Sequence, residues 1–268
     1  MTAGPVTSIK QCISPEEHAQ RFGVFAINLL LWLLLLLIIA ASMGIVLGLM
    51  ILGWLVTLIT AEYNVRKLQA CGATVSSEQL PVVYQALCDV CQQFGLQPDR
   101  YRLIILGSGE GNAFAIKFAR KRVIVILSEL LEGIIDNPAE LRAVIAHELA
   151  HSVLDHGWQS TLLLYRPAKY KQARELTCDN AALLAAGDLE AAKNTMKKLC
   201  VGNRLAGELS EDALIRESQC IEAGFVGWLI RQHLTHPTYG HRLFNLNESA
   251  RRLNLSPQPP LLADAAMR

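Results

Sequence analysis

An uncharged apolar run near the N-terminus limits most strongly what this chain can fold into. Residues 22–60 contain no charged side chain, and Asn28 is the only strongly polar residue among them. The core of a soluble domain does not need so long a run. A secretory signal peptide has an apolar stretch of only about 7 to 15 residues and a small-residue cleavage site. We therefore expect these residues to lie in a membrane, with a lipid bilayer as a partner of the chain.

The length of the run favours two crossings over one. A bilayer core about 30 Å thick is crossed by about 20 helical residues, so one helix through the whole run would be nearly twice too long. The small residues at 40–44, AASMG, can form a tight turn. The run therefore predicts a transmembrane helical hairpin at 22–61, with spans near 22–40 and 44–61. A single long span with an interfacial extension is the alternative.

The positive charges around the run predict its orientation. Lys10 and Arg21 precede it, Arg66 and Lys67 follow it, and the expected turn carries no charge. Because positively charged flanks stay in the cytoplasm, both ends of the hairpin and the domain that follows are expected on the cytoplasmic side.

Cysteine usage and net charge exclude other classes. The chain has seven cysteines, an odd number, which fits a reducing compartment better than a disulfide framework. Cys88 and Cys91 form a CxxC pair within an expected helix, without a second pair, so a structural role is favoured over metal or redox chemistry. The net charge of +1 gives no sign of a nucleic-acid surface.

The remaining pattern predicts an α+β chain, in which the hairpin is followed by a mainly helical domain with a small antiparallel sheet. Residues 1–21 form a polar arm, 62–77 resemble a linker at the start of a domain that extends to 253, and 254–268 form a C-terminal tail. A helix is expected from Pro81 to about Gly95. Three strands arranged as an antiparallel meander are expected at 101–106, 112–118 and 122–127. Further helices are expected at 137–157, 168–186, 188–201, 207–233 and 240–253.

The segment HELAH at 147–151 has the spacing of a zinc site. Histidines at positions i and i+4 of a helix share one face, so His147 and His151 can bind one ion. Glu148 follows the first histidine and is placed to reach a metal-bound water, as a general base does in HExxH hydrolases. Catalytic zinc has three protein ligands and one open position, so a third ligand must come from elsewhere.

A second acidic pair is a candidate for completing the site. Glu175 and Asp179 are one turn apart in the helix expected at 168–186. Glu175 would be the third ligand, and Asp179 could accept a hydrogen bond from the outer nitrogen of a zinc histidine. A solvated helix face would also explain these two residues taken by themselves.

The order of four motifs resembles a known family. GNAFA (111–115), HELAH (147–151), ELTCD (175–179) and THPTYGHRL (235–243) are similar to the ordered motifs of the membrane-anchored gluzincin metallopeptidases, which include HtpX and the CAAX prenyl endopeptidases. The resemblance covers residues 62 to about 253 and implies a zincin-type peptidase domain. A bacterial inner membrane is the location we expect for such a protein.

The resemblance also implies a role for each matching residue. It implies that His147, His151 and Glu175 bind one Zn²⁺, that Glu148 is the catalytic acid and base, and that Asp179 supports a zinc histidine. It places His236 near the reacting carbonyl. Pro237 restricts the backbone of His236 to extended conformations, which can fix the direction of that side chain. Arg242 either orients the site or holds the loop.

The chain departs from the family pattern in two places. Members like HtpX have further hydrophobic segments after the HExxH helix, whereas here only TLLLY (161–165) lies between His151 and Glu175. The active site is therefore expected in a soluble cap on a two-span anchor. His156 stands where many relatives have an aspartate, and a structural imidazole near the helix end is the favoured interpretation.

Substrate binding is predicted at an edge strand. Asn112 and Ala113 begin the strand expected at 112–118, and a substrate added to such an edge would bond their main chain. A buried strand with Asn112 in the turn is the alternative.

These expectations combine into one leading function. The chain would be a zinc-dependent endopeptidase that cleaves membrane-associated or misfolded proteins or peptides. A non-proteolytic membrane scaffold with a structural zinc site is the alternative. Prenyl-peptide processing is disfavoured because two spans do not enclose a large intramembrane chamber.

Overall fold

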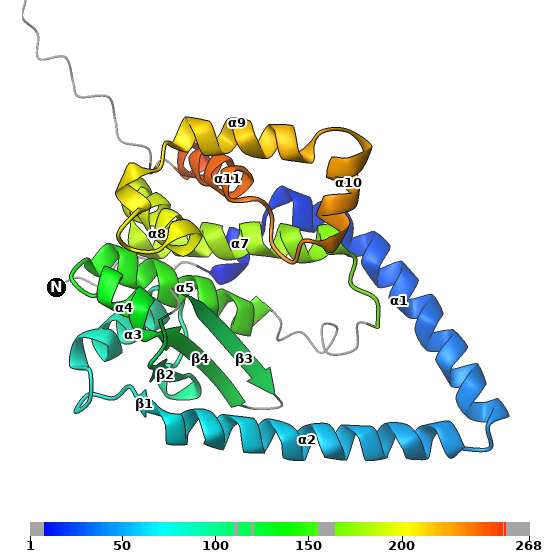
Figure 1. Cartoon of the computed structure of the whole chain (residues 1–268). Helices are drawn as coiled ribbons and strands as arrows, with labels where there is room; N and C mark the ends of the chain where they lie inside the picture. Colours follow the sequence, from blue (N-terminus) through cyan, green and yellow to red (C-terminus); the bar gives the residue numbers. More distant parts are fainter. Residues whose placement is uncertain (1–7, 110–111, 119–120, 155–163, 254, 256–268) are drawn as a thin grey trace, which may run out of the picture.

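The computed structural model has two long N-terminal helices that extend from a mainly helical domain (Figure 1). It describes residues 8–109, 112–118, 121–154, 164–253 and 255. The predicted C-terminal tail, apart from residue 255, lies outside these residues. His156 and the first three residues of TLLLY also lie outside them.

Two long apolar helices occupy the region predicted as a hairpin. They are α1 (Pro15–Ala41) and α2 (Ile45–Cys71), with mean hydropathies of 2.9 and 2.1 in their most apolar windows. Gly44 between them has φ +87°, a conformation that favours glycine. Length and composition allow both helices to cross a membrane. The two apolar helices and the turn are confirmed, and membrane crossing stays a prediction.

Both helices are longer than the predicted spans. Helix α1 begins inside the predicted polar arm, because Ser14 caps it by accepting a hydrogen bond from the Glu17 N–H at 3.2 Å and Pro15 suits its first turn. A short 3-10 turn, η1 (Ile9–Cys12), precedes it. Helix α2 continues through most of the predicted linker and leads into strand β1 (Gly72–Thr74), which the sequence did not predict.

The sheet has four strands in the order β1-β2-β4-β3. Strands β2 (Arg102–Leu106), β3 (Ala113–Phe118) and β4 (Lys121–Leu127) confirm the three predicted strands. The antiparallel meander was wrong, because β2 and β4 pair in parallel and β3 lies at the edge, antiparallel to β4. Six residues separate the end of β2 from the start of β3, which is enough to connect two strands that are not neighbours in the sheet. The sheet is therefore mixed.

The helices largely follow the predicted pattern, but α4 was not predicted and one predicted helix is divided. The helix expected at 207–233 is interrupted, because Ala223 is extended and Gly224 has φ +69°. This segment instead forms η3 (Ala206–Glu208), α9 (Glu211–Glu222) and α10 (Gly224–His233). The other elements are α3 (Pro81–Gln93), η2 (Pro98–Arg100), α4 (Ser128–Ile134), α5 (Pro138–Leu154), α7 (Ala168–Ala186), α8 (Leu189–Val201) and α11 (Tyr239–Arg252).

Helix α5 lies at the centre of the domain. Asn137 caps its N-terminus by accepting a hydrogen bond from the Ala139 N–H at 3.1 Å. Leu141, Ile145 and Leu149 are fully buried, in one core cluster with residues of α3, the sheet and α7. A helix that is buried on most sides is held rigidly, which suits side chains that must bind a ligand with fixed geometry.

Polar contacts connect the start of α1 to α7. Thr177 on α7 accepts a hydrogen bond from the Ser14 N–H at 2.9 Å and donates one to Glu17 at 2.6 Å. The Asn180 side chain donates to the Cys12 carbonyl at 2.9 Å. All of these groups are buried, so residues 12–17 pack against the domain.

Candidate metal centre

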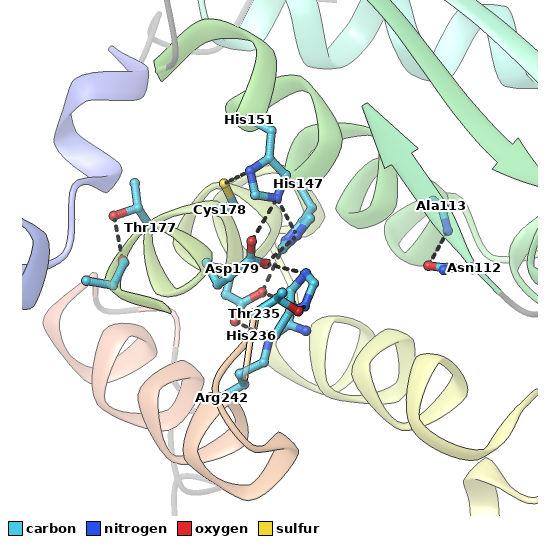
Figure 2. A network of polar contacts seen from close by, with 12 residues as sticks. Asn112, Ala113, His147, His151, Thr177, Cys178, Asp179, Thr235, His236 and Arg242 are labelled. Carbon is cyan, nitrogen blue, oxygen red and sulfur yellow. Dashed lines mark hydrogen bonds and ion pairs between the residues drawn. The ribbon is translucent and has the colours of Figure 1, made fainter. Parts of the chain in front are cut away.

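Helix α5 presents both histidines of the HELAH segment to one point. The Nε2 atoms of His147 and His151 lie 3.2 Å apart, although they belong to successive turns. Figure 2 shows the two rings pointing toward the same space. Two imidazoles whose nitrogens converge in this way are arranged to share one ion.

Glu175 on α7 completes a group of three potential ligands. Its Oε2 lies 3.5 Å from His147 Nε2, and its Oε1 lies 3.4 Å from His151 Nε2. One ligand atom from each residue falls within 4.8 Å of the others. Two helices that are adjacent in space but separated in sequence therefore build a His-His-Glu group.

These separations fit tetrahedral zinc. Ligand atoms about 2.0 to 2.1 Å from a zinc ion, at tetrahedral angles, lie about 3.3 to 3.4 Å from each other. The two Nε2 atoms are 3.2 Å apart, and the distances from His147 to Oε2 and from His151 to Oε1 of Glu175, 3.5 and 3.4 Å, are also close to this value. The Glu175 Oε2 atom is also buried and has no hydrogen-bond partner among the described residues. A buried carboxylate oxygen in this state is suited to a cation.

Asp179 fixes the orientation of His147 from behind. Its Oδ1 lies 3.1 Å from His147 Nδ1, so the imidazole presents Nε2 to the ligand group. Arg242 on α11 donates two hydrogen bonds to Asp179, from Nε at 2.9 Å and Nη2 at 2.7 Å. Figure 2 shows this chain of contacts below the two histidines. Glu175 and Asp179 are 7% and 0% exposed, so the solvated-face alternative is wrong.

Neighbouring charges shift the pKa values of His147, Glu175 and Asp179. Burial lowers the pKa of His147, but the neighbouring carboxylates of Asp179 and Glu175 outweigh this effect and raise the pKa to about 10. Burial also raises the pKa of Glu175, yet the two histidines hold it well below its usual range. The pKa of Asp179 is lowered because Arg242 offsets the effect of its burial. These contacts favour the ionised forms of Glu175 and Asp179 and a proton on His147, and a cation bound at Nε2 would displace that proton.

A cavity of about 730 Å³ opens beside the ligand group. Glu148, which is 7% exposed, lines it together with both histidines. The opposite wall comes from β3 and includes Asn112 and Ala113, which Figure 2 shows to one side of the histidines. A substrate in this cavity would contact Glu148 and the edge strand at once.

Every second residue of β3 has its backbone N–H and C=O directed toward the open edge of the sheet. The Asn112 carbonyl accepts a hydrogen bond from the Leu127 N–H at 2.9 Å, so it is committed to β4. Because bonding direction alternates along an antiparallel strand, the main-chain groups of Ala113 and Ala115 face outward. The Ala113 N–H is paired with its neighbour's side chain, Asn112 Oδ1, at 2.8 Å. The Asn112 side chain therefore contacts the outward N–H of Ala113.

His236 lies beside the ligand group but outside it. Its Nε2 is 3.5 Å from Glu175 Oε2, and its Nδ1 is 2.9 Å from Thr235 Oγ1. Its side chain is 56% exposed and lines the cavity, while Pro237 is buried behind it. Burial lowers the pKa of His236, which favours the neutral imidazole.

Two features of the site were not predicted. Cys178 Sγ contacts His151 Nδ1 at 3.4 Å. Cys178 belongs to the ELTCD segment, so its helical spacing from Glu175 could have predicted this contact. Met196 on α8 and Leu246 on α11 form part of the cavity wall, and no sequence signal marked either of these two residues. Cys88 and Cys91 lie on α3, and both are free thiols, with Cys91 in the core.

Comparisons with known proteins agree with this geometry. The family described as peptidase family M48 matches residues 78–168. The plastoglobule-localized metallopeptidase 48, chloroplastic, of Arabidopsis thaliana is 29% identical over 209 residues, which is 67% of this chain. The chain spans 60% of the length of that relative. No solved structure matches the chain.

The matched segment includes β3 and the HELAH helix but ends before Glu175. The position of Glu175 beside the two histidines is therefore independent of that match. These comparisons do not separate the HtpX-like and CAAX branches of the predicted resemblance. Over residues 78–168 the chain is similar to peptidase family M48, with both histidines and Glu148 inside the matched segment and Glu175 beyond it.

Proposed function

We propose that this protein is a membrane-anchored, zinc-dependent endopeptidase that cleaves membrane-associated or misfolded proteins. The observation that carries the proposal is the His147, His151 and Glu175 group, which opens onto a large cavity next to Glu148. M48 peptidases use zinc, and the distances among the three ligand atoms suit that ion.

His147, His151 and Glu175 hold the ion, and Asp179 keeps His147 in the tautomer that presents Nε2. When bound, zinc supplies Lewis acidity and lowers the pKa of water in the site. Glu148 takes the proton from the attacking water and later delivers it to the leaving nitrogen. His236 donates to the oxygen of the tetrahedral intermediate.

The edge of β3 aligns the substrate. A peptide added antiparallel or parallel to β3 would bond the outward main-chain groups of Ala113 and Ala115 and so pass along the cavity. Main-chain recognition accepts many sequences, which suits an enzyme that removes diverse proteins. Asn112 positions the first of these groups through its side chain.

The site geometry favours catalysis over a structural zinc. A structural site would close its fourth position with cysteine or histidine. Among the described residues, His236 is near the group yet not within the set whose ligand atoms all lie within 4.8 Å of one another. Cys178 contacts the Nδ1 side of His151, away from the shared Nε2 position.

The location follows from α1 and α2 and from the charges beside them. Both helices are long and apolar enough to span a bilayer, and Lys10, Arg21, Arg66 and Lys67 favour a cytoplasmic active site. A bacterial inner membrane fits this orientation. The Arabidopsis relative is described as chloroplastic and plastoglobule-localised, so in this respect it differs from our proposal.

The variant Glu148→Gln tests the proposed mechanism. It keeps all three ligands and removes the base, so we expect stoichiometric zinc and a loss of casein cleavage by several orders of magnitude. Zinc content by atomic emission and cleavage rate are measured on the same preparation. Near-wild-type cleavage by this variant would rule out the mechanism.

A further inference from the structure

Helix α10 exposes a continuous apolar face. Phe225 and Val226 are 71% and 67% exposed, and Trp228, Leu229 and Ile230 are also exposed. The rings of Phe225 and Trp228 stack with centroids 5.8 Å apart. The opposite side packs closely, because Gly227 is buried against the backbone of Glu222. Aromatic and aliphatic groups gathered on one exposed face indicate a surface that meets an apolar phase.

The C-terminal end of α10 lies close to α1. Glu16 and Gln20 of α1 line a cavity of about 250 Å³ together with Arg231 and Leu234. Gln172 on α7 donates hydrogen bonds to the carbonyls of Arg231 at 2.8 Å and Leu234 at 3.0 Å, which fixes the end of α10. Figure 1 shows α10 beside the first turns of α1. Helix α10 therefore lies level with the point where the apolar run of α1 begins.

A second segment accompanies α1 further into the apolar run. The Asn28 side chain donates to the Tyr165 carbonyl at 2.9 Å and accepts from the Tyr165 N–H at 2.9 Å. The side chains of Leu164 and Tyr165 are exposed there. Apolar side chains of the domain thus lie beside α1 at two places, which is expected where a domain contacts the bilayer that its anchor crosses.

We propose that the exposed face of α10 lies in the headgroup and upper acyl region of that bilayer, as an interfacial helix. This inference rests on the proposed membrane anchoring. Helix α10 has no acidic residue and carries Phe225 and Trp228 on its apolar face, a composition that suits the membrane interface. Leu234, Thr235 and His236 follow it directly and line the active-site cavity. The helix therefore holds this cavity wall near the membrane, where substrates are protein segments close to the bilayer.

Photo-crosslinking of the full-length protein in phosphatidylcholine and phosphatidylglycerol vesicles tests the placement. Benzoylphenylalanine is introduced at Val226 and, as a control, at Arg216, an exposed position on the neighbouring helix α9. We expect a phospholipid adduct by mass spectrometry at 226 and none at 216. Absence of lipid at 226, or a crosslinked pair of chains instead, would overturn the proposal.

The double variant Phe225→Glu and Trp228→Glu tests the consequence for substrates. We expect it to lose the lipid adduct at 226 and to cleave a soluble peptide like the wild type, while losing cleavage of the same peptide tethered to the vesicle. Unchanged cleavage of the tethered peptide would contradict the role of α10. A wild-type protein that cleaves neither peptide would overturn the peptidase proposal, and the adduct at 226 would still decide where α10 lies.

Discussion

Arg242 and Asp179 form a buried ion pair with two hydrogen bonds, and their side chains are 6% and 0% exposed. The pair connects α11 to α7, and Asp179 in turn contacts His147 on α5. Three helices that are far apart in sequence therefore meet at one potential metal ligand. Two roles were predicted for Arg242, to orient the site or to hold the loop. Its contacts with Asp179 support the first role.

Replacing Arg242 by lysine tests this connection. Lysine keeps the charge but cannot donate two parallel hydrogen bonds to Asp179, so His147 loses its fixed orientation. We expect zinc affinity to fall about 10- to 100-fold, measured by competition with a chromophoric chelator. Arg252→Lys, on the exposed side of the same helix, is the control and should bind zinc like the wild type. Unchanged affinity in Arg242→Lys would show that the ion pair does not act on the metal.

Glu175→Ala should differ from Glu148→Gln in its zinc content. It removes a ligand rather than the base, so we expect zinc content and peptidase activity to fall together. Both are measured on protein purified with equal zinc supplied. Full zinc occupancy in Glu175→Ala would place the third ligand elsewhere.

His236→Ala tests the proposed oxyanion donor. Such a donor contributes about 2.7 to 4 kcal/mol, so we expect kcat to fall about 100- to 1000-fold while zinc content and KM change little. The control is His241→Ala, because His241 is similarly exposed and contacts Glu222 rather than Glu175. Steady-state kinetics on one peptide distinguish the variants, and an unimpaired His236→Ala enzyme would remove His236 from the catalytic residues.

The membrane orientation makes a separate prediction. Reporter fusions at the N-terminus and after residue 70 should both report the cytoplasm, since the positive charges lie on both flanks of the hairpin. Opposite signals from the two fusions would indicate a single span and an active site on the other side.

Much of the site was predictable because helical spacing fixes geometry locally. His147 and His151 follow from a four-residue step, and Glu175 and Asp179 repeat that step on a second helix. The contact between Arg242 and Asp179 was not predictable from spacing, because it depends on how α11 packs on α7. The same reason applies to the cavity wall from Met196 and Leu246.

The fold shows the same division between local and long-range information. Strands and helices were predicted where apolar periodicity was clear, but strand pairing was not. Residues Val123 to Ile126 of β4 are all apolar and buried, which is typical of a central strand. This run could have predicted that β4 lies inside the sheet rather than at its edge. The start of α1 at Ser14 was not predicted, because it lies before the apolar run. A contact with Thr177 on α7, which the local sequence does not reveal, holds this end of the helix.

Asn28 provides the last prediction, because it is the single strongly polar residue of the apolar run and is 3% exposed. Its amide satisfies both backbone groups of Tyr165. In Asn28→Leu, α1 becomes more apolar, but the Tyr165 N–H and C=O lose their partner, at a cost of about 1 to 3 kcal/mol for each group that stays buried. We expect faster proteolysis near residue 165 and a lower unfolding temperature in vesicles. Leu29→Ile, at an exposed position one residue further along α1, should change neither. Equal stability of Asn28→Leu and the wild type would mean that this contact does not hold the domain against its anchor.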